Sequence, residues 1–127
     1  MNNQILILIT EAKEDLNNAK ESYRQNEFDS VTTKLYSSVE KILIALTIYE
    51  TRKVPKVTTT LIELGDELED FPSKFNNYLK DLTHDDFNTE YTSYQYSPHD
   101  SYKNEIKQLI RKAEEILEWA EEEITDD

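Results

Sequence analysis

The sequence contains no cysteine and a single glycine among its 127 residues. Without cysteine, the chain has neither a disulfide framework nor a thiolate metal site. One glycine cannot supply the positive-φ positions that hairpin turns require, or the glycine-rich loops that cradle phosphates. The composition therefore disfavours β-sandwiches, barrels and phosphate-loop folds, and it favours an all-α protein.

Long hydrophobic runs are also absent. The N-terminal apolar run from Ile5 to Ile9 lacks a basic flank and is followed by Thr10, so it predicts neither a signal peptide nor a membrane span. We therefore expect a soluble, cytoplasmic protein with no membrane partner. The length predicts a single domain over residues 1–127, with a frayed tail at 125–127.

Basic residues are outnumbered, because the chain has 14 Lys and Arg against 27 Asp and Glu, a formal net charge of −13. Such a chain repels nucleic acid at long range. DNA is therefore not expected as a partner, and any nucleic-acid role needs a local basic site. Small anions can still bind locally.

Apolar side chains recur every three or four residues over most of the chain, which is the spacing of helices with one buried face. The pattern predicts an up-and-down bundle of four main helices, with a short extra helix between the third and the last. Residues 84 to 99 show no such period. The main helices are expected at about 4–25, 28–52, 57–71 and 102–124, and the short one at about 75–82.

Tyrosines gather before the last predicted helix, where Tyr91, Tyr94, Tyr96 and Tyr102 fall within twelve residues. A long segment with so many amphipathic rings is typical of a binding site or an interface. The same rings can also simply cover the end of the bundle with their hydroxyls in water. Both interpretations remain open.

The last predicted helix begins with a basic stripe, Lys103, Lys107 and Arg111, and continues with glutamates. This order opposes the helix dipole, at a cost of about 0.3 to 1 kcal/mol per charge. An anion held near His99, Lys103 and Lys107 would offset that cost. The alternative that we favour is an ion pair with a second subunit or with a nearby carboxylate such as Glu67, Glu69 or Asp70.

Histidine is scarce, with only His84 and His99 in the sequence. With Asp86 and Asp100 these side chains could gather around zinc or iron, but no helical metal motif is present. We therefore expect no metal and no cofactor. In the second predicted helix, the charged pair Glu40 and Lys41 interrupts an apolar pattern, and its period favours an ion pair at a helix interface over contact with a ligand.

The order of these features resembles the HEPN domains, small all-α nucleotide-binding or RNA-cleaving modules of bacteria and archaea. The resemblance rests on Leu16-Asn17-Asn18-Ala19, the Asn26-Glu27-Phe28 turn, the segment Tyr36 to Leu46 with its central Glu-Lys, Pro55, and the segment Ala113 to Leu117 after the tyrosines. It implies a four-helix bundle, commonly a homodimer, whose active members cleave RNA without metal.

In those active members, an Arg and then a His stand at the start of the last helix. His99 occupies a fitting place, but no Arg occurs between Lys80 and Lys103. Neither Tyr94 nor Gln95 can replace the permanent charge that Arg offers a scissile phosphate. We therefore expect the ribonuclease activity to be lost.

The expected function is a dimeric bundle that binds a nucleotide, RNA or a nucleotidyltransferase partner, as in a toxin–antitoxin pair. The residues expected to contact the ligand are Tyr94, Gln95, Tyr96, Tyr102, Lys103 and Lys107, and the resemblance matches Tyr102 to a tyrosine that can receive a nucleotide. One alternative is a protein–protein interaction module without a ligand. Another is a weak, metal-independent ribonuclease in which His99 acts as general acid or base.

Overall fold

The structure is a computed structural model that describes residues 2–83 and 99–124. The described residues form helices and no strand, which confirms the all-α prediction. The helices are α1 (Asn3–Arg24), α2 (Phe28–Thr51), α3 (Leu61–Asp66), α4 (Ser73–Thr83) and α6 (His99–Glu123).

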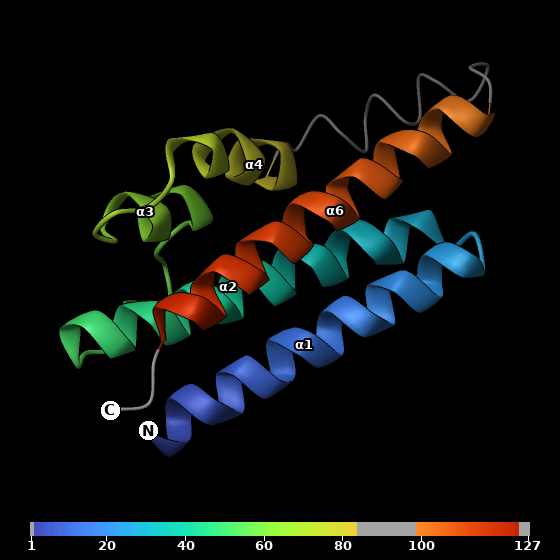
Figure 1. Cartoon of the computed structure of the whole chain (residues 1–127). Helices are drawn as coiled ribbons and strands as arrows, with labels where there is room; N and C mark the ends of the chain where they lie inside the picture. The colour runs from blue at the N-terminus through green and yellow to red at the C-terminus, as the bar shows by residue number, and fades with distance from the viewer. Residues whose placement is uncertain (1, 84–98, 125–127) are drawn as a thin grey trace.

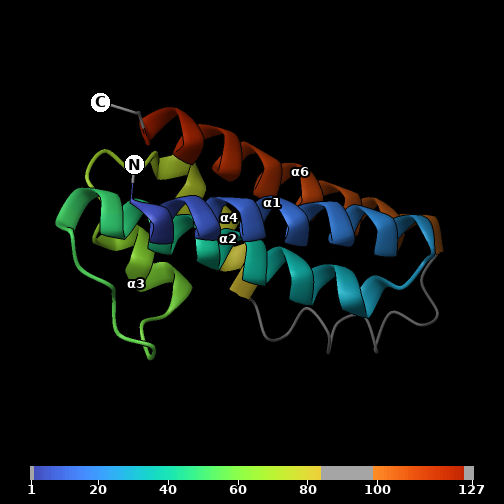
Figure 2. The same cartoon turned by 90° about the horizontal axis from the view of Figure 1, so that it is seen from below.

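Three long helices, α1, α2 and α6, lie side by side, and the shorter α4 packs along α6 (Figure 1). The chain runs along α1, returns along α2, runs out again along α4 and returns along α6. The start of α1 and the end of α6 therefore lie at the same end of the bundle in both views (Figures 1 and 2). This is the predicted up-and-down order, with α4 as its third member.

The predicted third helix at 57–71 is much shorter in the structure. Only Leu61–Asp66 is helical, and Val57, expected on the apolar face, is fully exposed. The helix begins late because Thr60 caps it: the Thr60 Oγ1 accepts from the Glu63 amide at 3.1 Å, and the Glu63 carboxylate accepts from the Thr60 amide at 3.0 Å. The short extra element of the bundle is therefore α3, not α4.

The core lies between α1, α2 and α6, where the helices approach closely because small side chains line the contacts. Five alanines in these helices have no exposed surface: Ala12, Ala19, Ala45, Ala113 and Ala120. Larger side chains such as Leu35, Ile42 and Ile116 fill the space around them. The apolar stripes predicted for these three helices are the faces that the structure buries.

Polar contacts join α1 to α2 beside this core. The Ser38 hydroxyl donates to the carbonyl of Ala12 at 2.7 Å in a buried position. The Lys41 Nζ lies 2.8 Å from the Asp15 Oδ2, which also accepts from the Ser37 hydroxyl at 2.8 Å. The hydrogen bond to Asp15 is the main cause that raises the pKa of Lys41. Lys41 thus forms an interhelical ion pair, as the sequence pattern favoured.

Candidate phosphate-binding cleft

A cleft of about 400 Å³ lies between the last turns of α1 and the middle turns of α6, residues 107–114. These two segments face each other because α1 and α6 run in opposite directions (Figure 1). The cleft is large enough for a small ligand. Its walls come from both helices: Lys20, Tyr23, Arg24, Lys107, Gln108, Ile110, Arg111 and Glu114.

The walls hold four cations and one carboxylate, in a chain whose formal net charge is −13. Three of the cations have partners: the Lys20 Nζ lies 3.0 Å from a Glu114 oxygen, and the Arg24 Nη1 lies 2.8 Å from a Glu21 oxygen. Arg111 lies 2.9 Å from Glu115. Lys107 is exposed and pairs with no carboxylate among the described residues. Lys107 is therefore the cation most open to an incoming anion.

The start of α6 is held against the α1–α2 turn by aromatic side chains. The rings of Tyr23 and Phe28 lie 5.9 Å apart, and Phe28 meets Tyr102 edge-on at 5.4 Å and 77°. The Lys103 Nζ lies 5.6 Å above the Tyr23 ring, within the range of a cation–π contact. These contacts fix the row of cations on α6 opposite those on α1.

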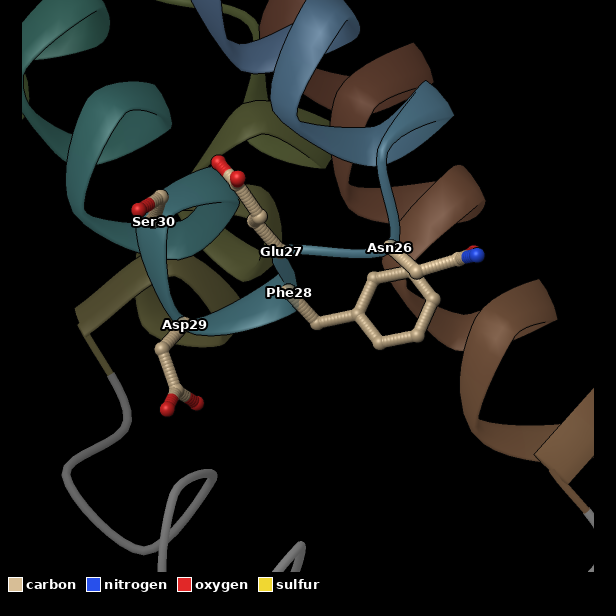
Figure 3. A pocket seen from close by; sticks show the side chains of 5 residues that line it. All are labelled: Asn26, Glu27, Phe28, Asp29 and Ser30. Carbon is tan, nitrogen blue, oxygen red and sulfur yellow. The ribbon is translucent and has the colours of Figure 1, made fainter.

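A second pocket, of about 250 Å³, lies at the turn between α1 and α2 and is lined by residues 26–30 (Figure 3). The ring of Phe28 points toward the ribbon of α6, while the carboxylates of Glu27 and Asp29 point away from that ring. Two carboxylates in so small a pocket disfavour an anionic ligand. The phosphate-binding candidate is therefore the cleft between α1 and α6.

Only some of the site residues predicted from the sequence lie in the part of the chain that the structure describes. Tyr94, Gln95 and Tyr96 lie outside the described residues, and His99 is the first residue of α6, with its side chain outside them as well. Tyr102 is buried against Phe28, with 5 % of its surface exposed. Lys103 and Lys107 lie beside the cleft and in its wall, respectively.

The charge order of α6 is balanced differently from the expectation. Arg111 is held by its own helix, through Glu115 and through Gln108, whose side-chain oxygen accepts from the Arg111 Nε at 3.0 Å. Lys103 lies over Tyr23. None of the ion pairs among the described residues joins this stripe to the carboxylates suggested for it, Glu67, Glu69 and Asp70.

Sequence reasoning missed the half of the cleft that α1 supplies. Lys20 and Arg24 stand four residues apart on α1, so they lie one turn apart on the same side of the helix. That spacing was visible in the sequence, but the side of α1 that faces α6 was not.

Metal ligands do not gather in the described ranges 2–83 and 99–124, where no group of three or more His, Asp or Glu side chains is placed to hold an ion. His84 and Asp86 lie outside these ranges, as do the side chains of His99 and Asp100. Among the helices of the same ranges, none is long and apolar enough to cross a membrane.

The HEPN domain family matches residues 5–124, which is nearly the whole chain. The chain therefore belongs to the HEPN domain family, a class of helical modules related to nucleotides and RNA. Comparisons with curated proteins and with solved structures gave no match. The match spans every helix of the bundle, so it includes both walls of the cleft.

Proposed function

We propose that this HEPN domain binds a phosphate-bearing ligand, a nucleotide or RNA, in the cleft between α1 and α6, and that it does not cleave RNA. The observation that carries the proposal is the gathering of four cations in one cleft of a chain with a net charge of −13. A local concentration of positive charge is what an acidic protein needs in order to bind an anion.

The ion pairs in the cleft do not block this role. The side chains of Arg24 and Glu21 are 66 % and 56 % exposed, and such exposed pairs contribute at most about 1 kcal/mol. A phosphate that approaches Lys107 can therefore replace the Glu21 carboxylate as the partner of Arg24 at small cost. Guanidinium groups such as that of Arg24 bind phosphate with two parallel hydrogen bonds.

The proposed loss of ribonuclease activity rests on the sequence before α6. Metal-independent cleavage needs a general acid or base and a cation that stabilises the charge on the scissile phosphate. His99 can supply the first, but no Arg stands between Lys80 and Lys103. The nearest Arg after His99 on α6 is Arg111, twelve residues further on and therefore about 18 Å along the helix.

The family resemblance extends the proposal to a homodimer in the cytoplasm with a nucleotidyltransferase as its partner, as in a toxin–antitoxin pair. Light scattering on the purified chain measures the first of these directly. A strict monomer would leave nucleotide binding possible but would remove a site shared between two subunits.

Thermal shift with mono- and oligonucleotides tests the binding, because a ligand that binds the folded state raises Tm by mass action. We expect a rise with the wild-type protein and with Lys13→Gln, and a reduced rise with Lys107→Gln. Lys13 is the matched control, since it joins α1 to α6 through Glu121 at 3.0 Å, outside the cleft walls. No shift at millimolar nucleotide would contradict the proposal and favour a protein–protein interaction module.

The same preparations test the absence of cleavage. Mixed-sequence RNA incubated in EDTA with the wild-type protein or with His99→Ala is expected to stay intact. Cleavage by the wild-type protein that His99→Ala abolishes would show a ribonuclease that works without the usual Arg.

A further inference from the structure

The cations of the cleft are arranged in rows and do not converge on one point. Lys103, Lys107 and Arg111 occupy successive turns of α6, so their Cα atoms rise by about 6 Å from one to the next. Lys20 and Arg24 occupy successive turns of α1 on the facing wall. Two facing rows suit an extended chain of phosphates better than a single phosphate.

Between the rows, the cleft is lined by less polar groups. Ile110 and Tyr23 belong to the walls, and the Gln108 amide nitrogen can donate hydrogen bonds, while its oxygen accepts from the Arg111 Nε. Proteins that bind single-stranded nucleic acid combine a basic groove along the backbone with aromatic and apolar surface for the bases. The composition of this cleft follows that pattern.

The row on α6 changes sign at its far end. At the same three- to four-residue spacing, Arg111 is followed by Glu114 and then by Glu118. Glu114 lines the cleft and binds Lys20 at 3.0 Å, and further along the same seam Glu121 binds Lys13 at 3.0 Å. A phosphate placed beyond Arg111 would therefore meet carboxylates.

We infer that the cleft between α1 and α6 tracks the backbone of single-stranded RNA over about three phosphates and that Glu114 ends this track. The inference rests on the proposed function and specifies its ligand as a short oligonucleotide, in place of a mononucleotide. The rows of cations set the path of the strand parallel to α6, and the carboxylates limit the number of phosphates that are bound.

Competition binding against a fluorescent RNA tests the length, with unlabelled oligouridylates of one to eight nucleotides and the full chain. We expect affinity to rise by about tenfold or more from one to four nucleotides and then to level off. Because each phosphate contact on a single strand contributes about 0.7 to the salt slope, the plateau slope should be about −2.

Variants locate the contact. Lys107→Gln should weaken the binding of the tetranucleotide several-fold and reduce the magnitude of the salt slope by about 0.7, the contribution of one phosphate contact. Lys13→Gln should change neither the affinity nor the slope. Equal affinity for one and four nucleotides would overturn the track but leave the proposed nucleotide binding intact. A continued rise to eight nucleotides would overturn the limit set by Glu114.

Two further outcomes separate the inference from charge alone. An oligoglutamate peptide of matched charge should compete much more weakly than the tetranucleotide, and equal competition would overturn recognition of nucleic acid. No binding by any oligouridylate or mononucleotide would overturn both the inference and the proposed function.

Discussion

The two halves of α6 make different kinds of contact with the rest of the molecule. In the first half, Lys103, Lys107 and Arg111 lie in or beside an open cleft. In the second half, Trp119 packs against Phe71 and Phe75 from the segment around α4. One helix therefore presents a charged surface at an open cleft and, farther along, an aromatic surface that packs against its own fold.

The charges of the two halves also differ, and only the far end of the acidic second half is remote from the cleft. About fifteen residues separate Lys107 from Glu122, which corresponds to about 22 Å along the helix. Salt screens exposed charges over about 8 to 10 Å under physiological conditions. Glu122 therefore contributes little to the field at Lys107, whereas Glu114 and Glu115 pair directly with Lys20 and Arg111.

The largest effect is expected from Trp119→Ala, which tests the packing half of α6, the second half that contains Trp119. The variant removes edge-on contacts to Phe71 at 5.4 Å and to Phe75 at 5.7 Å and leaves a space between α4 and α6. We expect a loss of about 3 kcal/mol in the free energy of unfolding, measured by urea denaturation with far-UV circular dichroism.

Trp119→Phe is the control for this variant, since it keeps an aromatic ring and should restore much of the stability. Oligonucleotide affinity of the folded Trp119→Ala protein should stay within about twofold of the wild type, a difference of under 0.5 kcal/mol. A parallel loss of affinity would show that the two halves of α6 do not act independently.

A smaller effect is expected from Gly65→Ala, which changes α3 where it supports the packing half. An added Cβ would come 2.7 Å from the Leu79 Cδ1 and 2.9 Å from the Phe71 Cε2. Overpacking of about 1 to 3 kcal/mol outweighs the gain of about 1 kcal/mol in helix propensity. We expect Tm to fall, whereas Asp66→Ala on the exposed side of α3 should leave it nearly unchanged. A rise in Tm for Gly65→Ala would show that Leu79 and Phe71 yield easily.

Sequence patterns predicted the long helices better than they predicted the cleft. The apolar periods of α1, α2 and α6 are long enough to fix both the helix and its buried face. At Val57, the period continued by chance through a segment that the Thr60 cap excludes from α3. Lys103 and Lys107 stood out because their charge opposes the dipole of α6, but Lys20 and Arg24 acquire meaning only when α1 lies against α6.

The smallest effect is expected at Glu115, where the two halves of α6 meet. Hydrogen bonding with Tyr78 of α4 is the main cause that lowers the pKa of Glu115 from its ordinary value of 4.5, and the charges of Lys74 and Arg111 lower it further. A carboxyl group whose pKa is lowered by folding adds stability above its unfolded pKa and loses it as the pH falls. The free energy of unfolding of the wild type should therefore exceed that of Glu115→Gln by under about 1 kcal/mol at pH 7. The difference should shrink as the pH falls below 4.5, as urea denaturation across that range can show. A difference that stays constant with pH would mean that Glu115 stabilises the fold through packing and that its charge makes no contribution.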